Sequence, residues 1–269
     1  MNRDGTGGTN LTSGSEEIRI LEHSYRWSPD GSMIAFMKAR PLPGDPNDPD
    51  DTWDIWVVRT DGAGEPTLVV EDATMPSWSP DGSKIAFETL LDFGQVWVIN
   101  LDGTGLTRLT NESISSGNPV WSPDGARIAF VTFVNTSGRT EIVVMNADGR
   151  GAVNLTQGRG YDKAPTWSPD GARIAFMTFA EPRDQFAFEV AVMNSDGTGR
   201  ANITNDPLSD DIDPTWSPDG REIAFARYFN DGTGGGFAGD IEIYVVNADG
   251  SGKRNISNRP EPYDTEPDW

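Results

Sequence analysis

The sequence of 269 residues contains no cysteine and a single histidine, His23. Without cysteine there is no disulfide and no thiolate metal site, so the redox state of the compartment stays open. One histidine excludes a His-rich metal centre, and a Ser-His-Asp triad would have to use His23. The G-x-S-x-G segment that carries the nucleophile of α/β-hydrolases is missing as well. These absences argue against an enzyme.

Basic residues are scarce and long apolar runs are absent. The 42 aspartates and glutamates outnumber 21 lysines and arginines, which gives a net charge of −21. This balance argues against nucleic acid, because phosphate binding needs a basic surface, and it favours metal cations or a basic protein or peptide partner. No apolar run approaches the roughly 18 residues of a membrane-spanning helix. The segment MNRDGTGGTN has no apolar core and does not read as a signal peptide.

The sequence contains an internal repeat. The phrase WSPDG occurs five times, each time before a short apolar run, and the sequence ends on EPDW. A second phrase of the type VMNSDGTG and a third that ends in Leu/Ile-Thr or Ile-Ser lie between successive copies. A period of 40 to 50 residues with several strands per unit predicts a propeller. The repeated tryptophans, which we expect to pack between neighbouring blades, are Trp27, Trp78, Trp121, Trp167, Trp216 and Trp269.

Each repeat predicts four strands, A to D. In the fourth repeat these are PTW at 165–167, RIAF at 173–176, VAVMN at 190–194 and NIT at 202–204. Asp-Gly between apolar runs predicts tight hairpin turns, because glycine accepts a positive φ. No segment has a 3.6-residue apolar period, so we expect no helix. The predicted fold class is all-β.

The combination of WSPDG, [KR]IAF, N-x-DG-x-G and an L-T end resembles the repeat of TolB-type β-propellers, over nearly the whole chain. The resemblance implies a six-bladed β-propeller of four-stranded blades. Propellers of this kind serve as protein-docking modules that hold a peptide at the mouth of the central channel, accompany the catalytic domains of some peptidases, and in one case form a lyase. The resemblance also implies a periplasmic or extracellular location.

The two ends of the sequence match different parts of the repeat. MNRDGTGGTNLT matches the end of strand C and strand D, whereas EPDW matches the start of strand A. We therefore expect one β-propeller domain over 1–269, with five complete blades plus a partial sixth built from both termini, as a fragment of a longer protein. A five-bladed ring and a gap filled by a second copy are the alternatives. We expect a monomer, with self-association through the incomplete blade as the competing state.

The acidic residues are unevenly distributed along the repeat. Antiparallel strand order places the short A–B and C–D turns at one face and the long B–C and D–A connections at the other, here called the loop face. The segments of the loop face contain 29 of the 42 acidic residues but only 9 of the 21 lysines and arginines. Since variable loops on a rigid scaffold often carry binding sites, we expect a basic partner at this face.

Acidic residues near the start of strand A are the candidate site at the channel mouth. They are Glu22, Asp72, Asp162, Asp211, Asp213, Asp264 and Glu266. Crowded carboxylates repel unless a cation joins them, and hard oxygen ligands suit Ca²⁺. The candidate Ca²⁺ ligands are Asp162, Asp211 and Asp264, or alternatively the loop residues Asp45, Asp48, Asp50, Asp51 and Asp54. A hydrated acidic surface without bound metal is the competing interpretation.

The sequence thus favours a non-catalytic protein-interaction scaffold whose acidic loop face and channel mouth bind a basic peptide or protein segment, with Ca²⁺ as a candidate ligand. The alternative is the regulatory or substrate-gating propeller domain of a larger peptidase or other hydrolase, with its catalytic domain outside this chain.

Overall fold

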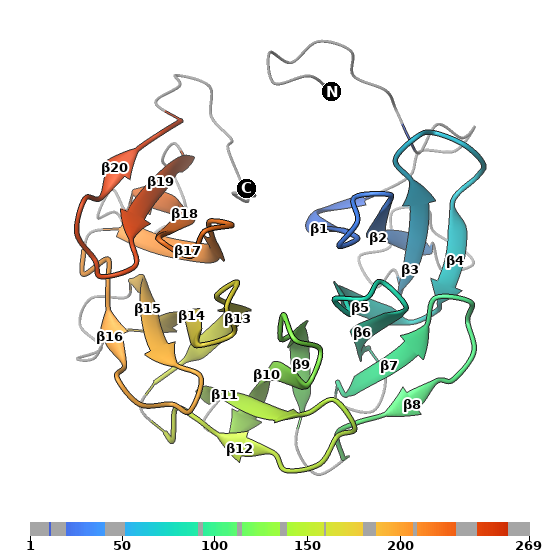
Figure 1. Ribbon diagram of the computed structural model, residues 1–269, viewed down its shortest axis with the longest axis horizontal. Coiled ribbons are helices and arrows are strands. Elements are labelled where there is room, and N and C mark those ends of the chain that lie inside the picture. Colours follow the sequence, from blue (N-terminus) through green and yellow to red (C-terminus); the bar gives the residue numbers. More distant parts are fainter. Residues whose placement is uncertain are drawn as a thin grey trace. The chain divides into compact units, whose positions relative to one another are not determined.

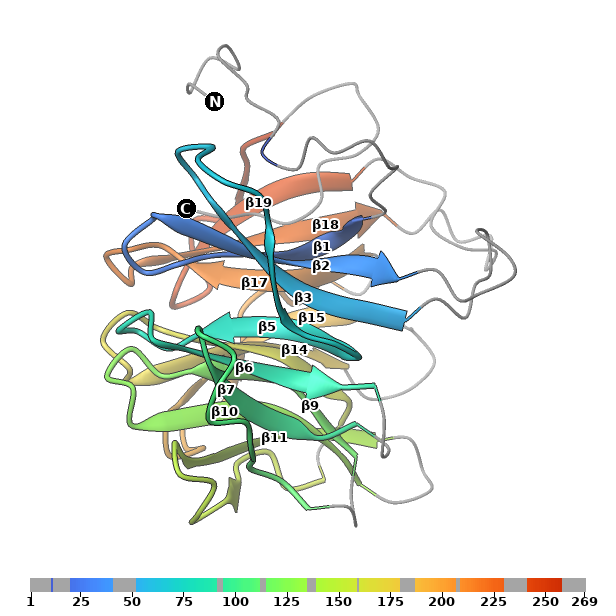
Figure 2. The same ribbon diagram turned by 90° about the vertical axis from the view of Figure 1, so that its right-hand side faces the viewer.

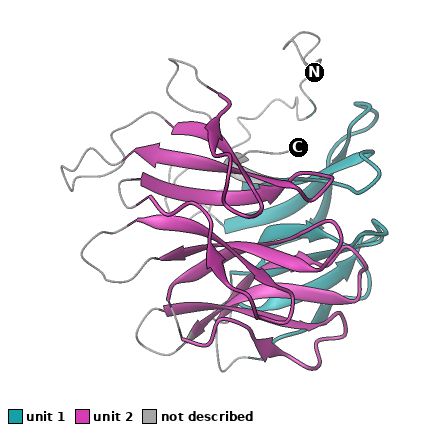
Figure 3. Cartoon of the chain, turned by 60° about the vertical axis from the view of Figure 1, so that its left-hand side comes forward, with its two compact units in different colours: residues 1–112 teal, residues 113–269 magenta. Residues whose placement is uncertain are grey.

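The structure is a computed structural model in which every regular element is a β-strand. The chain divides into two compact units, residues 1–112 and 113–269 (Figure 3). No helix occurs among the residues that the structure describes, which are 11, 20–40, 52–90, 94–111, 115–134, 139–158, 160–179, 187–206, 209–229 and 241–257. The all-β prediction is confirmed for these residues.

Unit 1 contains two four-stranded antiparallel sheets, each called a blade, in which strands adjacent in sequence pair with one another (Figure 1). Blade 1 consists of β1 (Ile20–Trp27), β2 (Met33–Arg40), β3 (Thr52–Arg59) and β4 (Thr67–Val70). Blade 2 consists of β5 (Ala73–Trp78), β6 (Lys84–Thr89), β7 (Val96–Asn100) and β8 (Thr107–Arg108). Figure 2 shows β5, β6 and β7 side by side.

Unit 2 contains three blades of the same construction. Blade 3 consists of β9 (Ser116–Trp121), β10 (Arg127–Val134), β11 (Arg139–Asn146) and β12 (Val153–Asn154). Blade 4 consists of β13 (Asp162–Trp167), β14 (Arg173–Phe179), β15 (Phe188–Asn194) and β16 (Ala201–Asn202). Blade 5 consists of β17 (Ser209–Trp216), β18 (Glu222–Phe229), β19 (Ile241–Asn247) and β20 (Arg254–Asn255).

The four strands predicted for the fourth repeat are all present in blade 4. Strands A, B and C extend further toward the loop face than predicted, because polar residues such as Asp162, Thr178 and Glu189 continue the ladder. Strand D is shorter than predicted, with two residues paired to β15. Apolar content predicted these strands, whereas backbone pairing sets their ends.

The SPDG turn is built by its own side chains. In blade 4, the Ser168 hydroxyl donates to Asp170 (2.6 Å) and accepts from the Arg173 N–H (2.9 Å), while Asp170 also accepts from the Ala172 N–H (3.0 Å). Gly171 has a φ of 67°, which glycine adopts without strain. The hydrogen bond from Ser168 lowers the pKa of Asp170. The aspartate of WSPDG is therefore a turn residue.

Within each unit, the repeated tryptophan packs on the preceding blade, as the sequence predicted. Its indole Nε1 donates to the carbonyl of the residue before the preceding blade's tryptophan: Trp78 to Arg26 (2.9 Å), Trp167 to Val120 (3.1 Å) and Trp216 to Thr166 (3.3 Å). These three side chains are only 6–8% exposed, whereas Trp27 is 50% exposed and Trp121 partly exposed. Trp269 lies outside the described residues.

An arginine reaches in the opposite direction, toward the following blade. Arg127 lies 4.7 Å from the Trp167 ring centroid and donates to the Gly171 carbonyl (3.3 Å). Arg173 lies 4.6 Å from the Trp216 ring and donates to the Gly220 carbonyl (2.9 Å). The basic residue of [KR]IAF therefore holds the next WSPDG turn in unit 2.

Strand A carries a bulge at the residue before its proline. The pairing register shifts there in four blades, and the residue has a φ near 50° in Met75, Asn118, Ala164 and Asp213. Such a left-handed conformation is unfavourable for residues other than glycine, and proline has no N–H to donate to the ladder. A bulge at x-Pro accommodates both constraints.

Leu11 belongs to the N-terminal phrase TNLT and lies beside blade 1. A Cβ placed on Gly62, in the C–D turn of blade 1, would lie 3.9 Å from Leu11 Cδ2. The equivalent Gly197 faces Leu155 of blade 3, and Gly250 faces Ile203 of blade 4. Leu155 and Ile203 belong to strand-D phrases, so Leu11 lies against blade 1 as those residues lie against blades 4 and 5.

Candidate functional site

Polar residues cross the blades of unit 2 at one register level, near the loop face. In blade 4, Thr178 pairs with Asp162 on one side and Glu189 on the other; in blade 5, Arg227 pairs with Asp211 and Glu242. We call these positions, with the Thr or Ser that stands two residues after strand D, the polar row. Its members are Ser116, Thr132, Glu141, Thr156, Asp162, Thr178, Glu189, Thr204, Asp211, Arg227, Glu242 and Ser257. Most of these side chains are buried.

The threonine two residues after strand D fastens the end of the strand-D phrase to the start of strand C. Thr204 Oγ1 accepts from the Val190 N–H (3.0 Å) and donates to the Glu189 carboxylate. The same two contacts recur at Ser257 in blade 5 and, with an amide in place of the carboxylate, at Thr110 in blade 2. The L-T phrase therefore has a structural role. Its hydroxyl donates a hydrogen bond to a Glu or Gln side chain whose role the sequence analysis did not predict. The signal was present: Gln95, Glu141, Glu189 and Glu242 each stand directly before the apolar run of strand C.

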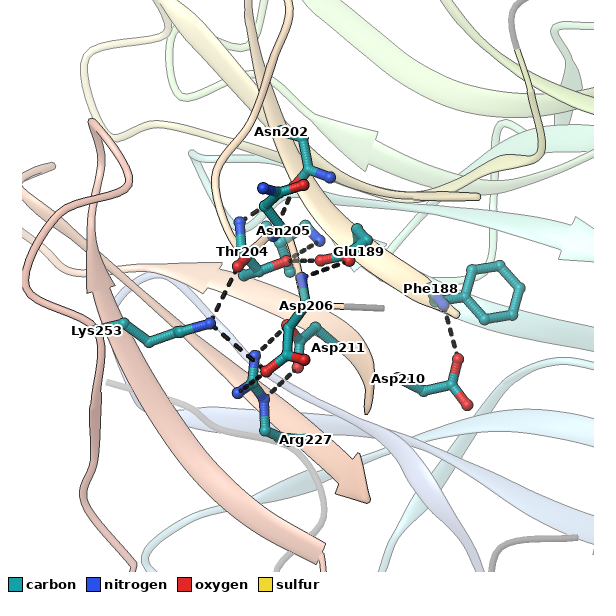
Figure 4. Close-up of polar contacts among 11 residues, drawn as sticks. Phe188, Glu189, Asn202, Thr204, Asn205, Asp206, Asp210, Asp211, Arg227 and Lys253 are labelled. Atoms are coloured by element: carbon teal, nitrogen blue, oxygen red, sulfur yellow. Dashed lines mark hydrogen bonds and ion pairs between the residues drawn. The ribbon is translucent and has the colours of Figure 1, made fainter. Parts of the chain in front are cut away.

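Asp211 is the centre of an ion cluster between blades 4 and 5 (Figure 4). Its carboxylate is 0% exposed and accepts from Arg227 Nε and Nη2, each at 2.6 Å. Arg227 Nη1 also donates to Asp206 (2.8 Å) and its guanidinium lies 4.7 Å from the Tyr244 ring centroid. Burial raises the pKa of Asp211, and the hydrogen bonds from Arg227 oppose that rise.

Two further groups extend this cluster. The Glu189 carboxylate accepts from the Asp206 N–H (2.6 Å), and burial raises the pKa of Glu189. Lys253 Nζ donates to the Thr204 carbonyl (3.0 Å) and lies 3.9 Å from Asp206. Backbone and side chains of two blades are thereby joined by charge-assisted hydrogen bonds.

Asp162 occupies the equivalent position in blade 4 and is also paired. It is 0% exposed and accepts from Arg200 Nη1 (3.0 Å) and Nη2 (2.9 Å), while Arg200 also donates to Thr178 (2.6 Å). The Arg200 guanidinium lies 5.0 Å from the Phe176 ring centroid. In both blades the candidate channel-mouth aspartate thus already holds an arginine that rests on an aromatic ring. Any added cation would have to displace that arginine.

In unit 1, three carboxylates lie around the Arg40 guanidinium. It is bonded to Asp72 and lies 3.2 Å from Glu71 and 3.6 Å from Asp54. Asp54 also accepts from the Asp72 N–H (3.1 Å), and burial raises its pKa. Asp54 and Asp72, predicted as members of two alternative sites, are therefore neighbours around one arginine.

The other predicted site residues are dispersed or lie outside the described residues. Asp213 occupies the left-handed bulge position of β17 and is partly exposed. The Glu22 side chain, Asp264, Glu266 and the loop residues Asp45, Asp48, Asp50 and Asp51 are outside the described part. Within that part, no group of three His, Cys, Asp or Glu side chains is arranged to hold a metal ion. The Ca²⁺ sites remain predictions. No described helix could span a membrane.

Repeated four-stranded antiparallel blades, with tryptophan contacts between neighbouring blades within each unit and arginine contacts in unit 2, define a β-propeller protein. Residues 44–186 match the TolB β-propeller domain family, over more than half of the chain. The chain therefore belongs to the TolB β-propeller family. No curated protein matches it in sequence.

Solved structures agree on the fold. TolB from Acinetobacter baumannii shares 21% identity with a TM-score of 0.67, and the match covers 88% of this chain and 54% of that one. A TolB-like protein from Agrobacterium tumefaciens shares 22% identity with a TM-score of 0.65, covering 86% and 79%. A puromycin-hydrolyzing peptidase from Mycobacterium tuberculosis shares 14% identity with a TM-score of 0.63, covering 88% and 38%. The chain spans about half the length of the Acinetobacter TolB.

Proposed function

We propose that the chain is a non-catalytic interaction scaffold whose acidic loop face binds a basic peptide or protein segment. The observation that carries the proposal is the segregation of charge. On the face of the short turns, aspartates such as Asp170 and Asp196 are hydrogen-bonded within their own turns. The segments of the loop face have 29 acidic residues and 9 lysines and arginines. The loop face therefore carries a net negative charge that its own basic residues do not neutralise.

A field of this sign speeds the encounter with a basic partner and weakens as salt screens it. The buried ion clusters support the proposal indirectly, because they fix the loop-face ends of neighbouring blades and so preorganise the surface. Membership in the TolB family adds the precedent of protein docking. By the same precedent we propose a periplasmic or extracellular location.

Calorimetric titration with an acetylated tetralysine peptide tests this function. The variant Glu71→Gln/Asp213→Asn removes two charges from the loop face, and the matched control Glu65→Gln/Glu222→Gln removes two from the opposite face. We expect the first variant to weaken binding several-fold at low salt and the control to change it less. Equal effects of the two variants, or no saturable binding by the wild type, would refute the proposal.

Calcium is the ligand to test next. Titration of the metal-stripped protein with Ca²⁺ at constant ionic strength, with Mg²⁺ as control, tests for a specific site. The proposed ligands are Asp162, Asp211 and Asp264, or alternatively the loop residues Asp45, Asp48, Asp50, Asp51 and Asp54. Saturation near one site with a rise in Tm supports a Ca²⁺-stabilised face. A response that Mg²⁺ reproduces indicates a diffuse field.

A second candidate function rests on the similarity to longer chains. The match to the puromycin-hydrolyzing peptidase covers 38% of that chain, and the match to a second puromycin hydrolase covers 40%. In this alternative the chain is the regulatory or substrate-gating propeller of a larger hydrolase. Sequencing the transcript on both sides of the encoded chain tests it: an adjoining hydrolase domain supports it, and flanking stop codons refute it.

A further inference from the structure

The C–D turn of each blade contains an Asp-Gly pair, and the five aspartates are Asp61, Asp102, Asp148, Asp196 and Asp249. The turns are alike in their backbone. Each aspartate is exposed, and each following glycine has a φ between 72° and 87°. The glycine N–H donates to the carbonyl of the residue three positions earlier, over 2.8–3.3 Å. The turns differ in how the aspartate side chain is held.

In blades 2, 4 and 5 a hydroxyl two residues after the aspartate holds its carboxylate. Thr104, Thr198 and Ser251 each donate to it through the hydroxyl at 2.6 Å and through the backbone N–H at 2.9 Å. The hydroxyl also accepts from the amide of the asparagine that ends strand C, at 2.9–3.1 Å. We call this chain of side-chain hydrogen bonds the hydroxyl brace.

Blade 3 lacks the hydroxyl brace. Arg150 stands where blades 2, 4 and 5 have Thr or Ser, and its backbone N–H donates to Asp148 at 3.0 Å. In blade 1, Arg59 Nε donates to Asp61 at 3.1 Å and so replaces the brace. The aspartates of the five WSPDG turns each accept from a serine hydroxyl at 2.5–2.7 Å. Among the ten Asp-Gly turns of the described residues, Asp148 is therefore the aspartate whose carboxylate has no side-chain donor.

An Asp-Gly pair can isomerise without any co-reactant, because glycine has no side chain to hinder its backbone nitrogen. The Gly149 nitrogen would attack Cγ of the Asp148 carboxyl group, so that a C–N bond forms and the carboxyl hydroxyl leaves with the amide proton as water. Water then adds to the backbone carbonyl of this succinimide and opens the ring. The product is isoaspartate, whose main chain contains one more methylene group.

Hydrogen bonds to the carboxyl group oppose this reaction. The group must rotate toward the glycine nitrogen, and each bond that holds it must first break. Asp148 has one such bond, whereas each braced aspartate has two. The hydroxyl bonds also lower the pKa of Asp102, Asp196 and Asp249, which keeps these groups ionised and therefore poor acceptors of a nucleophile.

We propose that Asp148 is the preferred site of spontaneous isoaspartate formation among the ten described Asp-Gly turns, because it lacks the hydroxyl brace. The modification lies in the hairpin between β11 and β12, which pair at Val143–Asn154 and Val144–Val153. The added methylene group should therefore loosen β12 from blade 3. This inference is independent of the proposed function.

Peptide mapping with electron-transfer fragmentation, which distinguishes isoaspartate from aspartate, tests the proposal on protein aged at pH 6. We expect isoaspartate to accumulate about fivefold faster at Asp148 than at Asp102, Asp196 and Asp249, as for the absence of one hydrogen bond. In urea-denatured protein no brace exists and glycine follows each aspartate, so the difference should disappear.

Reciprocal variants test the brace itself. Arg150→Thr supplies the hydroxyl and should slow isomerisation at Asp148 about fivefold. Arg150→Ala removes the same charge without adding a hydroxyl and should leave that rate unchanged. Thr198→Ala removes a brace and should raise the rate at Asp196 about fivefold. The unaltered turns of each variant are internal controls for its folding.

Equal rates at Asp148 and at the braced aspartates of the folded protein would overturn the proposal. A rate at Asp148 that Arg150→Thr leaves unchanged would do the same, as would equal slowing by Arg150→Ala, which would assign the effect to charge. Absence of isoaspartate at Asp148 while the denatured protein forms it would show that the backbone of the turn protects the residue without a brace. If Arg150→Thr does not fold, the rate at Asp196 in Thr198→Ala decides.

Discussion

At the scale of single residues, the aspartates of WSPDG show how a repeated motif stabilises the fold without being a site. The hydroxyls of Ser28 and Ser79 lower the pKa of Asp30 and Asp81 to about 2. The unfolded value is near 3.9. Because the folded pKa is depressed, these groups stabilise the protein above about pH 4, and the contribution is lost as pH falls toward 2.

We therefore expect Asp30→Asn/Asp81→Asn to melt below the wild type at pH 6. The difference in Tm should shrink as pH falls below 4 and be small at pH 2, where about half of the wild-type carboxylates are protonated. Thermal melts followed by circular dichroism between pH 2 and 6 measure this. A difference that stays constant with pH would show that the turn depends on shape alone. Glu189 acts in the opposite sense, because burial raises its pKa and protonation relieves the cost of its charge.

Ala164 tests the bulge conformation. With a φ of 48°, it pays a steric cost that glycine avoids, so Ala164→Gly should stabilise the protein by about 0.5 kcal/mol or leave it unchanged despite the added chain entropy. The control Ala175→Gly, at a fully buried position of β14, should destabilise it by about 1 kcal/mol or more. Urea denaturation of both variants decides; equal losses would contradict the strain at residue 164.

At the scale of the strand, Thr204→Val tests the fastening of strand D to strand C. The change leaves the Val190 N–H without its acceptor and removes one of the donors to the buried Glu189 carboxylate, which keeps the Asp206 N–H. We expect a loss of about 2 kcal/mol in the free energy of unfolding. Thr198→Val, which removes the two hydrogen bonds of an exposed turn hydroxyl, is the control and should cost less. The prediction fails if the two variants are equally stable.

Strand patterns were accessible from the sequence because turns and apolar runs are local. WSPDG, the Asp-Gly turns and the RIAF runs predicted the order of strands, and the tryptophan contacts between blades followed from the repeat. The site was less accessible. Asp162 pairs with Arg200, 38 residues away, only because adjacent turns and blades pack together. A count of charges along the sequence does not detect such a pair, so every carboxylate was counted as free. Glu189 is buried for the same reason, although its repeated position before strand C was visible.

At the scale of the whole molecule, Leu11 tests whether the N-terminal phrase supports blade 1. Leu11→Ser should destabilise unit 1 by about 1 kcal/mol, since part of an apolar side chain returns to water. Hydrogen exchange should rise in β3 and β4 and stay unchanged in blade 4. Leu106→Ser, at a position 53% exposed, is the matched control and should have little effect. Equal exchange in the two variants would remove Leu11 from the support of blade 1.

The tryptophan and arginine contacts of unit 2 have a consequence for how such a chain can grow. The indole bond runs from a later blade to an earlier one, and the guanidinium bond runs from the earlier blade to the later one. Blade 4 thus carries both connectors, Trp167 toward blade 3 and Arg173 toward blade 5. Tandem duplication of residues 168–216 would present both connectors in register at the new junction. The number of blades can therefore change in evolution by duplication of one segment, without any new kind of contact between blades.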